Sequence, residues 1–388
     1  MQMLKWLKSI PNWKDLENWG TEEDQEFLNL VMVNYNEDKS RMTFKYKMIP
    51  NNMTTEEGIP VWDAYDKKLR ECRGITFDTE RRECILYPFD KFFEIDQVEE
   101  TALDKVKEAI SKASKEDIEF SEKLDGSLTS MRWYNGELVV ASMGRNESSF
   151  VEYLKSFITP EIEEMCKENP NYTFIFECLE ELYPHVVKYT QEDLGLHMLS
   201  YRNMETEEVS SYHQSKELAD RYQVRHIPIL DTTLEQELKR LANTSGYDRE
   251  GSVVRIDGWR VKVKGEDYKR LHHTTSSVGV NELIERTANG TLDEIYDDLT
   301  ELNKGIVKKI QQYVEAVDDQ ARVWLERAPS TPREFHTEYV QQIPEYLKRI
   351  VCARYKTKEY IHPLIKSMQG YVQWKDIEEG LKAIEKEQ

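Results

Sequence analysis

Residues 121–138 of the chain read SEKLDGSLTSMRWYNGEL, and this stretch decides the fold. Its second half places Asn135 and Gly136 between two apolar segments, which is the strongest short signal for a β-hairpin. The stretch SVVRIDGWRVKVKG, residues 252–265, repeats the pattern around Asp257 and Gly258. The sequence therefore predicts two antiparallel hairpins, one around each pair.

The segments around the hairpins predict both strands and helices. Residues 171–181, NYTFIFECLEE, are apolar on both faces and predict a short buried strand. A helix is expected over 101–117, and another over 149–168 that ends near Pro170. From about residue 279 onward the apolar spacing is helical and turn residues are few, so we expect an all-helical C-terminal region with helices in 301–328, 336–355 and 374–388.

Length and composition favour two domains in a reducing compartment. A chain of 388 residues exceeds the size of one hydrophobic core, and the Ser/Thr-rich stretch HHTTSSVG at 272–279 is the expected boundary. We expect one domain over 1–275 and another over 276–388. No apolar run reaches membrane-spanning length, and no export signal is recognisable. Five cysteines without a C-x-x-C pair argue against a disulfide framework or a zinc ribbon, and favour an intracellular location.

The net charge of -20 argues against a broad DNA-wrapping surface, so any nucleic-acid site must be a local patch. Two basic clusters stand out. The first consists of Lys262, Lys264, Lys269, Arg270, His272 and His273, and the second of Lys348, Arg349, Arg354, Lys356 and Lys358. The second cluster is either a solvated face or a docking surface.

Lys123 is a candidate nucleophile. A lysine must lose its proton to react, and burial and neighbouring positive charges both favour that loss. Lys262 and Lys264 are two residues apart on a predicted strand, so they point to one face while Val261 and Val263 point to the core. Two lysines on one face repel each other unless an anion lies between them, and a polyphosphate would satisfy both.

Acidic residues accompany these lysines. Glu250 and Ser252 share a face of the second hairpin, and Glu177 lies in an apolar strand where an unpaired carboxylate would be costly. A sugar hydroxyl, a hydrated magnesium ion or a lysine would each be a partner for Glu177, and Asp125 could share the metal. Gly126 would let the backbone approach a ligand, and the neighbouring serine at 127 offers a hydroxyl. Taken singly, each element is also explained as a turn, a solvated strand edge or a structural ion pair.

As an ordered set, the motifs EKLDGS, FIFECL, REGSVV and RVKVKG resemble those of the covalent nucleotidyltransferases, the superfamily of ATP-dependent ligases and RNA-capping enzymes. The segments LRECRGITFD and YPFDKFFEI upstream, DYKRLHHTTSS after the last motif, and KSMQGY near the end are similar to the bacteriophage RNA ligase 1 family. The likeness is strong from about 69 to 280. It implies an α+β fold, in which an ATP-grasp-like nucleotidyltransferase domain of antiparallel sheets and helices precedes an all-helical domain.

The resemblance also implies roles for individual residues. The catalytic residues would be Lys123, Lys262, Lys264 and Tyr268. The ATP-binding residues would be Tyr46, Arg73, Lys91, Lys123, Asp125, Gly126, Glu177, Lys262 and Lys264, and the metal-binding residues Glu177, Glu250 and Asp293. The family's third motif usually carries a lysine where this chain has Ala141 and Met143, and Arg145 is the nearest cation that could substitute.

The implied activity is ATP- and Mg²⁺-dependent joining of RNA ends that carry a 5′-phosphate and a 3′-hydroxyl, through a lysyl-AMP and an adenylylated RNA. The implied substrate is a nicked tRNA anticodon loop, docked by the helical domain through the cluster around Arg349 and Arg354, in the cytoplasm of a phage-infected bacterium. Two alternatives stay open. One is a ligase that seals other nicked polynucleotides, and the other is a nucleic-acid-binding module with weakened catalysis.

Overall fold

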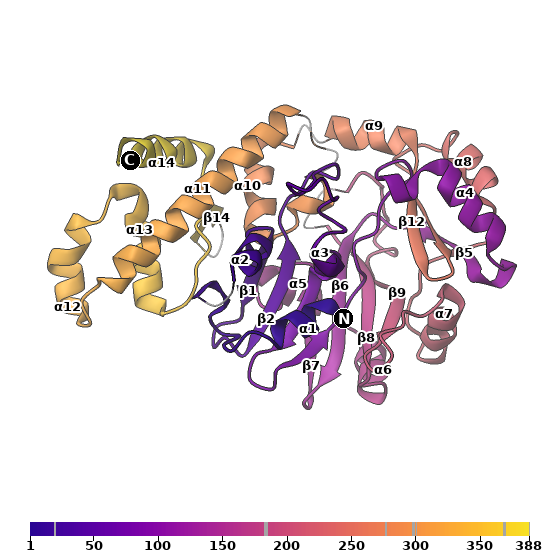
Figure 1. Ribbon diagram of the computed structural model, residues 1–388, viewed down its shortest axis with the longest axis horizontal. Coiled ribbons are helices and arrows are strands. Elements are labelled where there is room, and N and C mark those ends of the chain that lie inside the picture. Colours follow the sequence, from indigo (N-terminus) through magenta and orange to yellow (C-terminus); the bar gives the residue numbers. More distant parts are fainter. Residues whose placement is uncertain are drawn as a thin grey trace. The chain divides into compact units, whose positions relative to one another are not determined.

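The computed structural model describes residues 1–18, 21–181, 185–275, 278–296, 299, 301–367 and 370–387. The chain divides into two compact units, Met1–Thr274 and Thr275–Gln388, and each is described here by itself. In its described part, the first unit contains three four-stranded sheets whose paired strands run antiparallel (Figure 1). The second unit is mainly helical. None of the described helices is both long and apolar enough to cross a membrane.

The first sheet belongs to the N-terminal part of the chain. Its strand order is β1-β2-β3-β4, and aromatic side chains fill its core, with Trp6, Phe27, Phe44 and Phe77 making edge-to-face contacts. The strands are β1 (Val31–Tyr35), β2 (Arg41–Tyr46), β3 (Arg73–Asp78) and β4 (Glu83–Leu86), and the helices are α1 (Gln2–Leu7), α2 (Glu22–Asn29) and α3 (Lys68–Glu71).

The second sheet, in the order β7-β6-β8-β9, has three helices packed on one face. Apolar residues of these helices and of the strands form one cluster, including Leu154, Met165 and Leu218 from the helices and Phe174 and Phe176 from the sheet. The strands are β6 (Ser127–Tyr134), β7 (Glu137–Ser142), β8 (Tyr172–Leu179) and β9 (Gly195–Asn203), and the helices are α5 (Ser149–Lys155), α6 (Pro160–Glu168) and α7 (Tyr212–Arg221).

The third sheet, in the order β10-β5-β11-β12, is covered on one face by α4 and α8. Val106 of α4 and Leu241 of α8 pack with Val254, Val261 and Val263 of the sheet. The elements are α4 (Leu103–Lys112), β5 (Ile118–Lys123), β10 (Ile229–Leu230), α8 (Leu234–Leu241), β11 (Gly251–Ile256) and β12 (Trp259–Lys264), and α9 (Glu266–Thr275) follows.

The chain passes from the third sheet to the second immediately after Lys123. Lys123 is the last residue of β5 and Ser127 the first of β6, so residues 124–126 make the crossing. A Cβ on Gly126 would lie 2.5 Å from the carbonyl oxygen of Cys178 in β8. Glycine is therefore required there because β8 lies against the crossing backbone, which is a different reason from the ligand approach that the sequence suggested.

Both hairpins are confirmed. Asn135 and Gly136 have φ of 52° and 84°, and Asp257 and Gly258 have φ of 45° and 83°. Two consecutive residues with positive φ are what a type I′ turn requires, and such a turn matches the twist of the strands that it joins. The buried strand within 171–181 is also confirmed, as β8 in the interior of the second sheet.

Two of the helix predictions were too long. The expected helix over 149–168 is two helices, because α5 ends at Lys155 and α6 begins at Pro160, where Thr159 accepts a hydrogen bond from the Ile162 amide. A Thr N-cap followed by Pro at the first helical position is a standard helix start. The helix expected over 101–117 is confirmed only as Leu103–Lys112.

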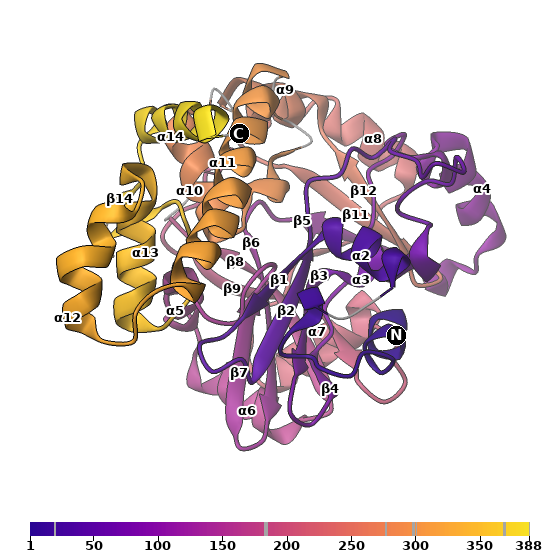
Figure 2. The ribbon, with the colours of Figure 1, turned by 60° about the vertical axis from the view of Figure 1, so that its left-hand side comes forward.

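In the second unit, α11 packs against α10, α13 and α14 (Figure 2). The helices expected in 301–328 and 374–388 are confirmed, but the one expected over 336–355 starts only at 345 because Pro344 interrupts it. The all-helical prediction was wrong in one detail, a two-stranded ribbon of β13 and β14. The elements are α10 (Val280–Asn289), α11 (Glu301–Glu326), α12 (Pro332–Glu334), α13 (Glu345–Thr357), β13 (Ile365–Ser367), β14 (Gly370–Tyr371) and α14 (Trp374–Glu387).

A buried ion pair between α8 and the start of β11 gives a test of the fold. Arg249 Nη2 lies 2.9 Å from Glu237 Oε1, and both side chains are almost fully buried. We expect Glu237→Ala to lower the free energy of unfolding by about 3–5 kcal/mol, because it leaves the buried guanidinium only the more distant Glu122, 3.8 Å from its Nε. The exposed Glu235→Ala on the same helix should change it by less than about 0.5 kcal/mol. Urea unfolding measures both, and equal effects would contradict a structural role for the pair.

Candidate active site

The site is centred on an ion pair between Lys123 and Glu250. Lys123 pairs in register with Gly251 of β11, which brings the lysine next to Glu250. Its Nζ donates to Glu250 Oε2 at 2.7 Å, and Lys264 Nζ lies 3.3 Å from Glu250 Oε1. Glu250 is therefore the acid that neutralises these lysines, a role for which the sequence had offered Glu177.

The strand β12 presents its lysines as the period-two pattern predicted. Val261 and Val263 are buried in the core beneath the third sheet, while Lys262 and Lys264 lie on the opposite face. Burial lowers the pKa of Lys262 well below its usual value, and the positive charges of Lys91, Arg73, Lys264 and Lys123 lower it further. Five cations from four separate segments therefore meet at this face.

Aromatic rings surround one of these cations, Lys91. Lys91 Nζ lies 5.1 Å from the ring centroids of Tyr46 and Trp62 and 5.4 Å from that of Phe93. These three rings form a cage, in which Tyr46 meets Trp62 edge-to-face at 5.0 Å. Cation–π attraction at such distances stabilises an ammonium in a partly desolvated place.

Phe92 occupies the space between the cage and β12. The Arg73 guanidinium is 5.4 Å and Lys262 Nζ is 5.2 Å from its ring centroid. The backbone around it pairs with β12, because the Lys262 amide donates to the Phe93 carbonyl at 2.9 Å and the Ile95 amide donates to the Lys262 carbonyl at 3.0 Å. This pairing fixes Lys91 and Lys262 on adjoining pieces of backbone.

Glu177 faces the same cations from the second sheet. Burial raises its pKa to about 7, the charges of Lys123 and Arg73 oppose the rise, and those of Glu250 and Asp125 add to it. No residue in the described part of the chain donates a hydrogen bond to its carboxyl group. A carboxyl group of this kind is suited to a hydroxyl or a metal-bound water, as the sequence suggested.

Asp125 is used within the protein. Its Oδ2 accepts hydrogen bonds from the amides of Val186 and Val187 at 2.9 and 3.2 Å, and its own amide donates to the Tyr189 hydroxyl at 2.7 Å. Burial alone would raise the pKa of Asp125, but the close approach of His185 and these amide donors hold it well below its usual range. Asp125 therefore anchors the segment 185–189, and its carboxylate has little freedom to share a metal.

His185 completes this anchor. Its ring nitrogens lie 3.8 Å from Asp125 and 3.4 Å from Glu180, and Glu180 also accepts a hydrogen bond from the Ser127 hydroxyl. Burial alone would lower the pKa of His185, but Asp125 and Glu180 outweigh it and raise the pKa to about 10. His185 is therefore a buried cation between two acids.

Tyr268 links the anchored segment to the lysines. It is 2% exposed and packs against Val186, Val187 and Leu271. Lys264 Nζ lies 5.7 Å from its ring centroid. The predicted residues of the first unit thus surround one region, formed by Lys123, Glu250, Lys262, Lys264, Arg73, Lys91, Tyr46, Glu177, Asp125, Gly126 and Tyr268.

The roles of the remaining predicted residues, Asp293 and Arg145, stay predictions. Asp293 belongs to the second unit, in the turn Leu292–Glu294, so its assignment as a metal ligand stays a prediction. Arg145 lies in the turn after β7, where its backbone pairs with Ser142, and its substitution for the missing lysine also stays a prediction. Ala141 and Met143 are buried in apolar clusters, which explains why no lysine stands there.

The fit to a magnesium ion rests on Glu177 and Glu250. No group of three or more potential metal-ligating side chains occurs among the described residues. Magnesium needs no such group, because it is usually held by one or two carboxylates together with substrate phosphates and waters. The two glutamates beside five cations fit a metal that is shared with a polyphosphate.

The first basic cluster is smaller than its sequence suggested. Lys269 pairs with Glu94 and Glu266, and Arg270 pairs with Asp267. Of the Lys and Arg residues of this cluster, Lys262 and Lys264 are therefore the ones that contribute positive charge to the site. The side chain of His273 lies outside the described residues.

The docking role expected for the cluster around Arg349 and Arg354 stays a prediction, but both of these side chains make contacts within the second unit. Arg354 is 8% exposed, pairs with Asp318 of α11 and donates to the Ile361 carbonyl. Arg349 donates to the carbonyls of Ile365 and Pro363. Both guanidinium groups therefore hold the second unit together, and the spacing of basic residues along α13 could not reveal this.

Sequence reasoning missed several residues around the site. His185, Glu180, Trp62 and Phe92 act through tertiary contacts, and no local motif marks them. Arg260 had a signal, because it continues the alternation of Lys262 and Lys264 on β12.

Comparison with known proteins agrees with the geometry. A family model described as RNA ligase matches residues 71–268, just over half of the chain. Among solved structures, an archaeal ATP-dependent RNA ligase is 14% identical with a TM-score of 0.39, and the match covers 53% of each chain. A Naegleria gruberi RNA ligase with pyrophosphate is 21% identical with a TM-score of 0.32, over 40% of this chain and 52% of that one. This chain thus spans about half the length of these structures. No curated protein matches it.

The raised pKa of Glu177 predicts a pH dependence of stability. Between its ordinary value near 4.5 and about 7, the folded chain binds more protons than the unfolded chain, so stability falls as pH rises. The free energy of unfolding of Glu177→Gln, relative to that of the native protein, should rise by about 1–3 kcal/mol across this pH window and stay constant above it. Urea unfolding at several pH values measures the difference. For the exposed Glu164→Gln, the difference in free energy of unfolding from the native protein should not change with pH. If the difference for Glu177→Gln did not change with pH either, the raised pKa of Glu177 would be refuted.

The raised pKa of His185 predicts a dependence at higher pH. The stability that its charge contributes is complete below pH 6.5 and is lost as pH rises through about 10. The deficit of His185→Gln relative to the native protein should therefore shrink from about 2–4 kcal/mol at pH 6 toward zero at pH 10 in thermal or urea unfolding. His197→Gln is the control, because burial lowers the pKa of His197 and its effect is confined to acidic pH. A deficit that is constant with pH would contradict the charged pair.

Proposed function

Since the chain belongs to the RNA ligase family, of the phage RNA ligase 1 type, we propose that it is an ATP-dependent RNA ligase that uses Lys123 as its nucleophile. It would join a 5′-phosphate to a 3′-hydroxyl through a lysyl-AMP and an adenylylated RNA. The observation that carries this proposal is the position of Lys123 Nζ, 2.7 Å from a buried acid and among the cations of β3, β12 and the Lys91 cage.

The first step needs a neutral amine. In the proposed reaction the lone pair of Lys123 Nζ attacks the α-phosphorus of ATP, a P–N bond forms, and the bond to pyrophosphate breaks. Nζ must lose two protons, one before it attacks and one after the P–N bond has formed. Glu250 Oε2, 2.7 Å away, is a nearby acceptor for the first proton, and the second would pass to solvent. Arg73, Lys91 and Lys262 would neutralise the departing pyrophosphate.

The later steps reuse the same atoms. An oxygen of the RNA 5′-phosphate attacks the lysyl-AMP phosphorus, the P–N bond breaks, and the adenylylated RNA leaves Nζ free. The 3′-hydroxyl of the second RNA end then attacks the 5′-phosphorus and AMP departs. Glu177 and Glu250 would hold Mg²⁺, which supplies charge neutralisation at the phosphates when bound.

The two units would divide the work. We propose that residues 1–275 form the adenylyltransferase domain and that 276–388 contribute to docking the RNA, through side chains other than Arg349 and Arg354. A broken tRNA anticodon loop is the substrate that the resemblance implies. It is therefore the first RNA to test.

Covalent labelling with α-labelled ATP and magnesium tests the nucleophile. We expect label that survives denaturation in the native protein and a loss of at least 100-fold in Lys123→Ala, measured on a denaturing gel. Lys123→Arg should not restore labelling, because a guanidinium stays protonated. Lys262→Ala and Lys264→Ala should each reduce labelling by tenfold or more. Lys216→Ala, on the surface of α7, is the matched control.

The outcomes separate the three candidate functions. Labelling followed by sealing of a nicked tRNA supports the proposal. Labelling with sealing of nicked DNA or duplex RNA alone would support a ligase for other ends. ATP binding without covalent label would show a binding module and overturn the proposal.

A further inference from the structure

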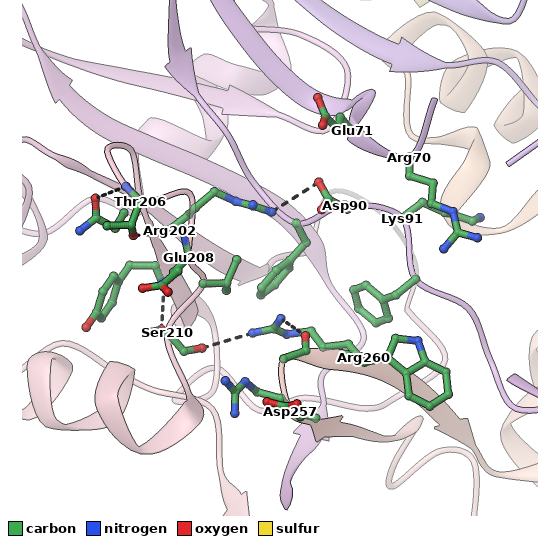
Figure 3. A pocket seen from close by; sticks show the side chains of 18 of the residues that line it. Arg70, Glu71, Asp90, Lys91, Arg202, Thr206, Glu208, Ser210, Asp257 and Arg260 are labelled. Atoms are coloured by element: carbon green, nitrogen blue, oxygen red, sulfur yellow. Dashed lines mark hydrogen bonds and ion pairs between the residues drawn. The ribbon is translucent and has the colours of Figure 1, made fainter. Parts of the chain in front are cut away.

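A cavity of about 770 Å³ opens beside the candidate active site. Its walls are the start of β8, the end of β9, the hairpin of β11 and β12, residues 89–92, and parts of the segments 67–71 and 206–214. Figure 3 shows Asp90, Lys91, Arg202, Ser210 and Arg260 around it. Lys91 and Phe92 line this cavity and also belong to the candidate active site around Lys123. The cavity and the active site therefore adjoin each other. The lining contains six Lys or Arg residues and four acids, in a chain whose net charge is -20.

Arg260 is the feature that needs explanation. It is 7% exposed, and its two terminal nitrogens donate to the carbonyls of Gly258 and Ser210, both at 3.2 Å. Its Nε has no hydrogen-bond partner, and no acid in the described part of the chain pairs with it. Its guanidinium lies 4.7 Å from the Phe89 ring centroid. A buried cation with carbonyl contacts but no counter-ion favours the binding of an anion.

Two neighbouring arginines, Arg255 and Arg202, add further positive charge near Arg260. Arg255 stands opposite Arg260 in the strand register, where like charges are unfavourable, but Glu119 neutralises it at 3.1 Å. Arg202, 5% exposed, lies 3.4 Å from Asp90 and keeps an Nε without a hydrogen-bond partner among the described residues. Figure 3 shows Arg202 reaching Asp90 and Arg260 reaching Ser210 at the same cavity.

The position of Arg260 on β12 connects the cavity to the nucleophile. Arg260, Lys262 and Lys264 are spaced by two residues, so they form one row on one face of the strand. At one end of the row, Lys264 lies beside Glu250, the partner of Lys123. Lys262 lies over Phe92 in the middle, and Arg260 lines the cavity at the other end. An anionic chain held at Lys123 would follow this row into the cavity.

The other lining residues narrow the chemistry of the anion. Besides Phe89 and Phe92, the cavity is lined by Trp259 and by Tyr172 and Tyr201, which stack on each other at 4.5 Å. Arginines beside aromatic rings are the combination that binds single-stranded nucleic acid, because guanidinium groups meet phosphates and rings stack on bases.

We propose that this cavity binds a nucleotide of the RNA strand, near its reacting end, with a phosphate at Arg260 and Arg202 and the base against the aromatic wall. This inference rests on the proposed function and assigns the position of its RNA substrate. A free nucleotide carries the same chemistry, so the experiment distinguishes the two sources.

Binding of a 5′-phosphorylated RNA oligonucleotide, measured by fluorescence anisotropy on the full-length protein, tests the proposal. We expect Arg260→Gln to weaken binding by tenfold or more, and Arg260→Lys to weaken it less. Glu208→Gln, which removes an exposed acid from the cavity lining, should strengthen binding about two- to threefold. Arg221→Gln, exposed on α7, is the matched control and should bind as the native protein does.

The covalent labelling assay separates this proposal from the previous one. Lysyl-AMP formation by Arg260→Gln shows that the variant is folded, and native RNA affinity in such a variant would overturn the cavity assignment. If Arg260→Gln does not fold, Glu208→Gln and Trp259→Ala decide, since one should strengthen and the other weaken RNA binding. Competition by AMP at the same concentration as the oligonucleotide would identify a free-nucleotide site and overturn the RNA assignment. Absence of labelling in the native protein would refute the proposed function itself.

Discussion

The contact of Glu250 with Lys123 and Lys264 is the interaction on which the site depends. It joins the ends of three adjacent strands, β5, β11 and β12, and it places one acid among side chains that otherwise repel one another. Like charges gather only where the fold compensates them, and here a carboxylate and aromatic rings provide the compensation. The polyanion expected at this site would complete it.

Much of the first unit follows from local signals in the sequence. The Asn-Gly and Asp-Gly pairs require positive φ at two consecutive residues, and that requirement fixes both hairpins and their registers. The errors lie where a single residue overrides periodicity. Pro160 and Pro344 begin new helices inside stretches whose apolar spacing is continuous, and β13 and β14 are too short to produce an alternating pattern.

The site was predictable where its residues lie in ordered motifs, and not where it depends on tertiary contacts. Lys123, Lys262 and Glu177 could be selected because their chemistry and spacing point to one face of each strand. The anchor formed by His185 could not, because it joins segments 60 residues apart. Burial also changes the role of a charged residue. The sequence suggested that Arg354 contacts a ligand at the surface, but in the structure it is buried and pairs with Asp318.

The aromatic cage around Lys91 has a consequence for how tightly anions are held. A lysine side chain normally loses rotational freedom when it grips a ligand, at a cost of up to about 2 kcal/mol. Three rings within 5.4 Å already restrict this one, so most of that entropy is lost during folding. Under the proposed function, an incoming phosphate would therefore meet a pre-organised ammonium, and more of the electrostatic attraction would be retained as affinity.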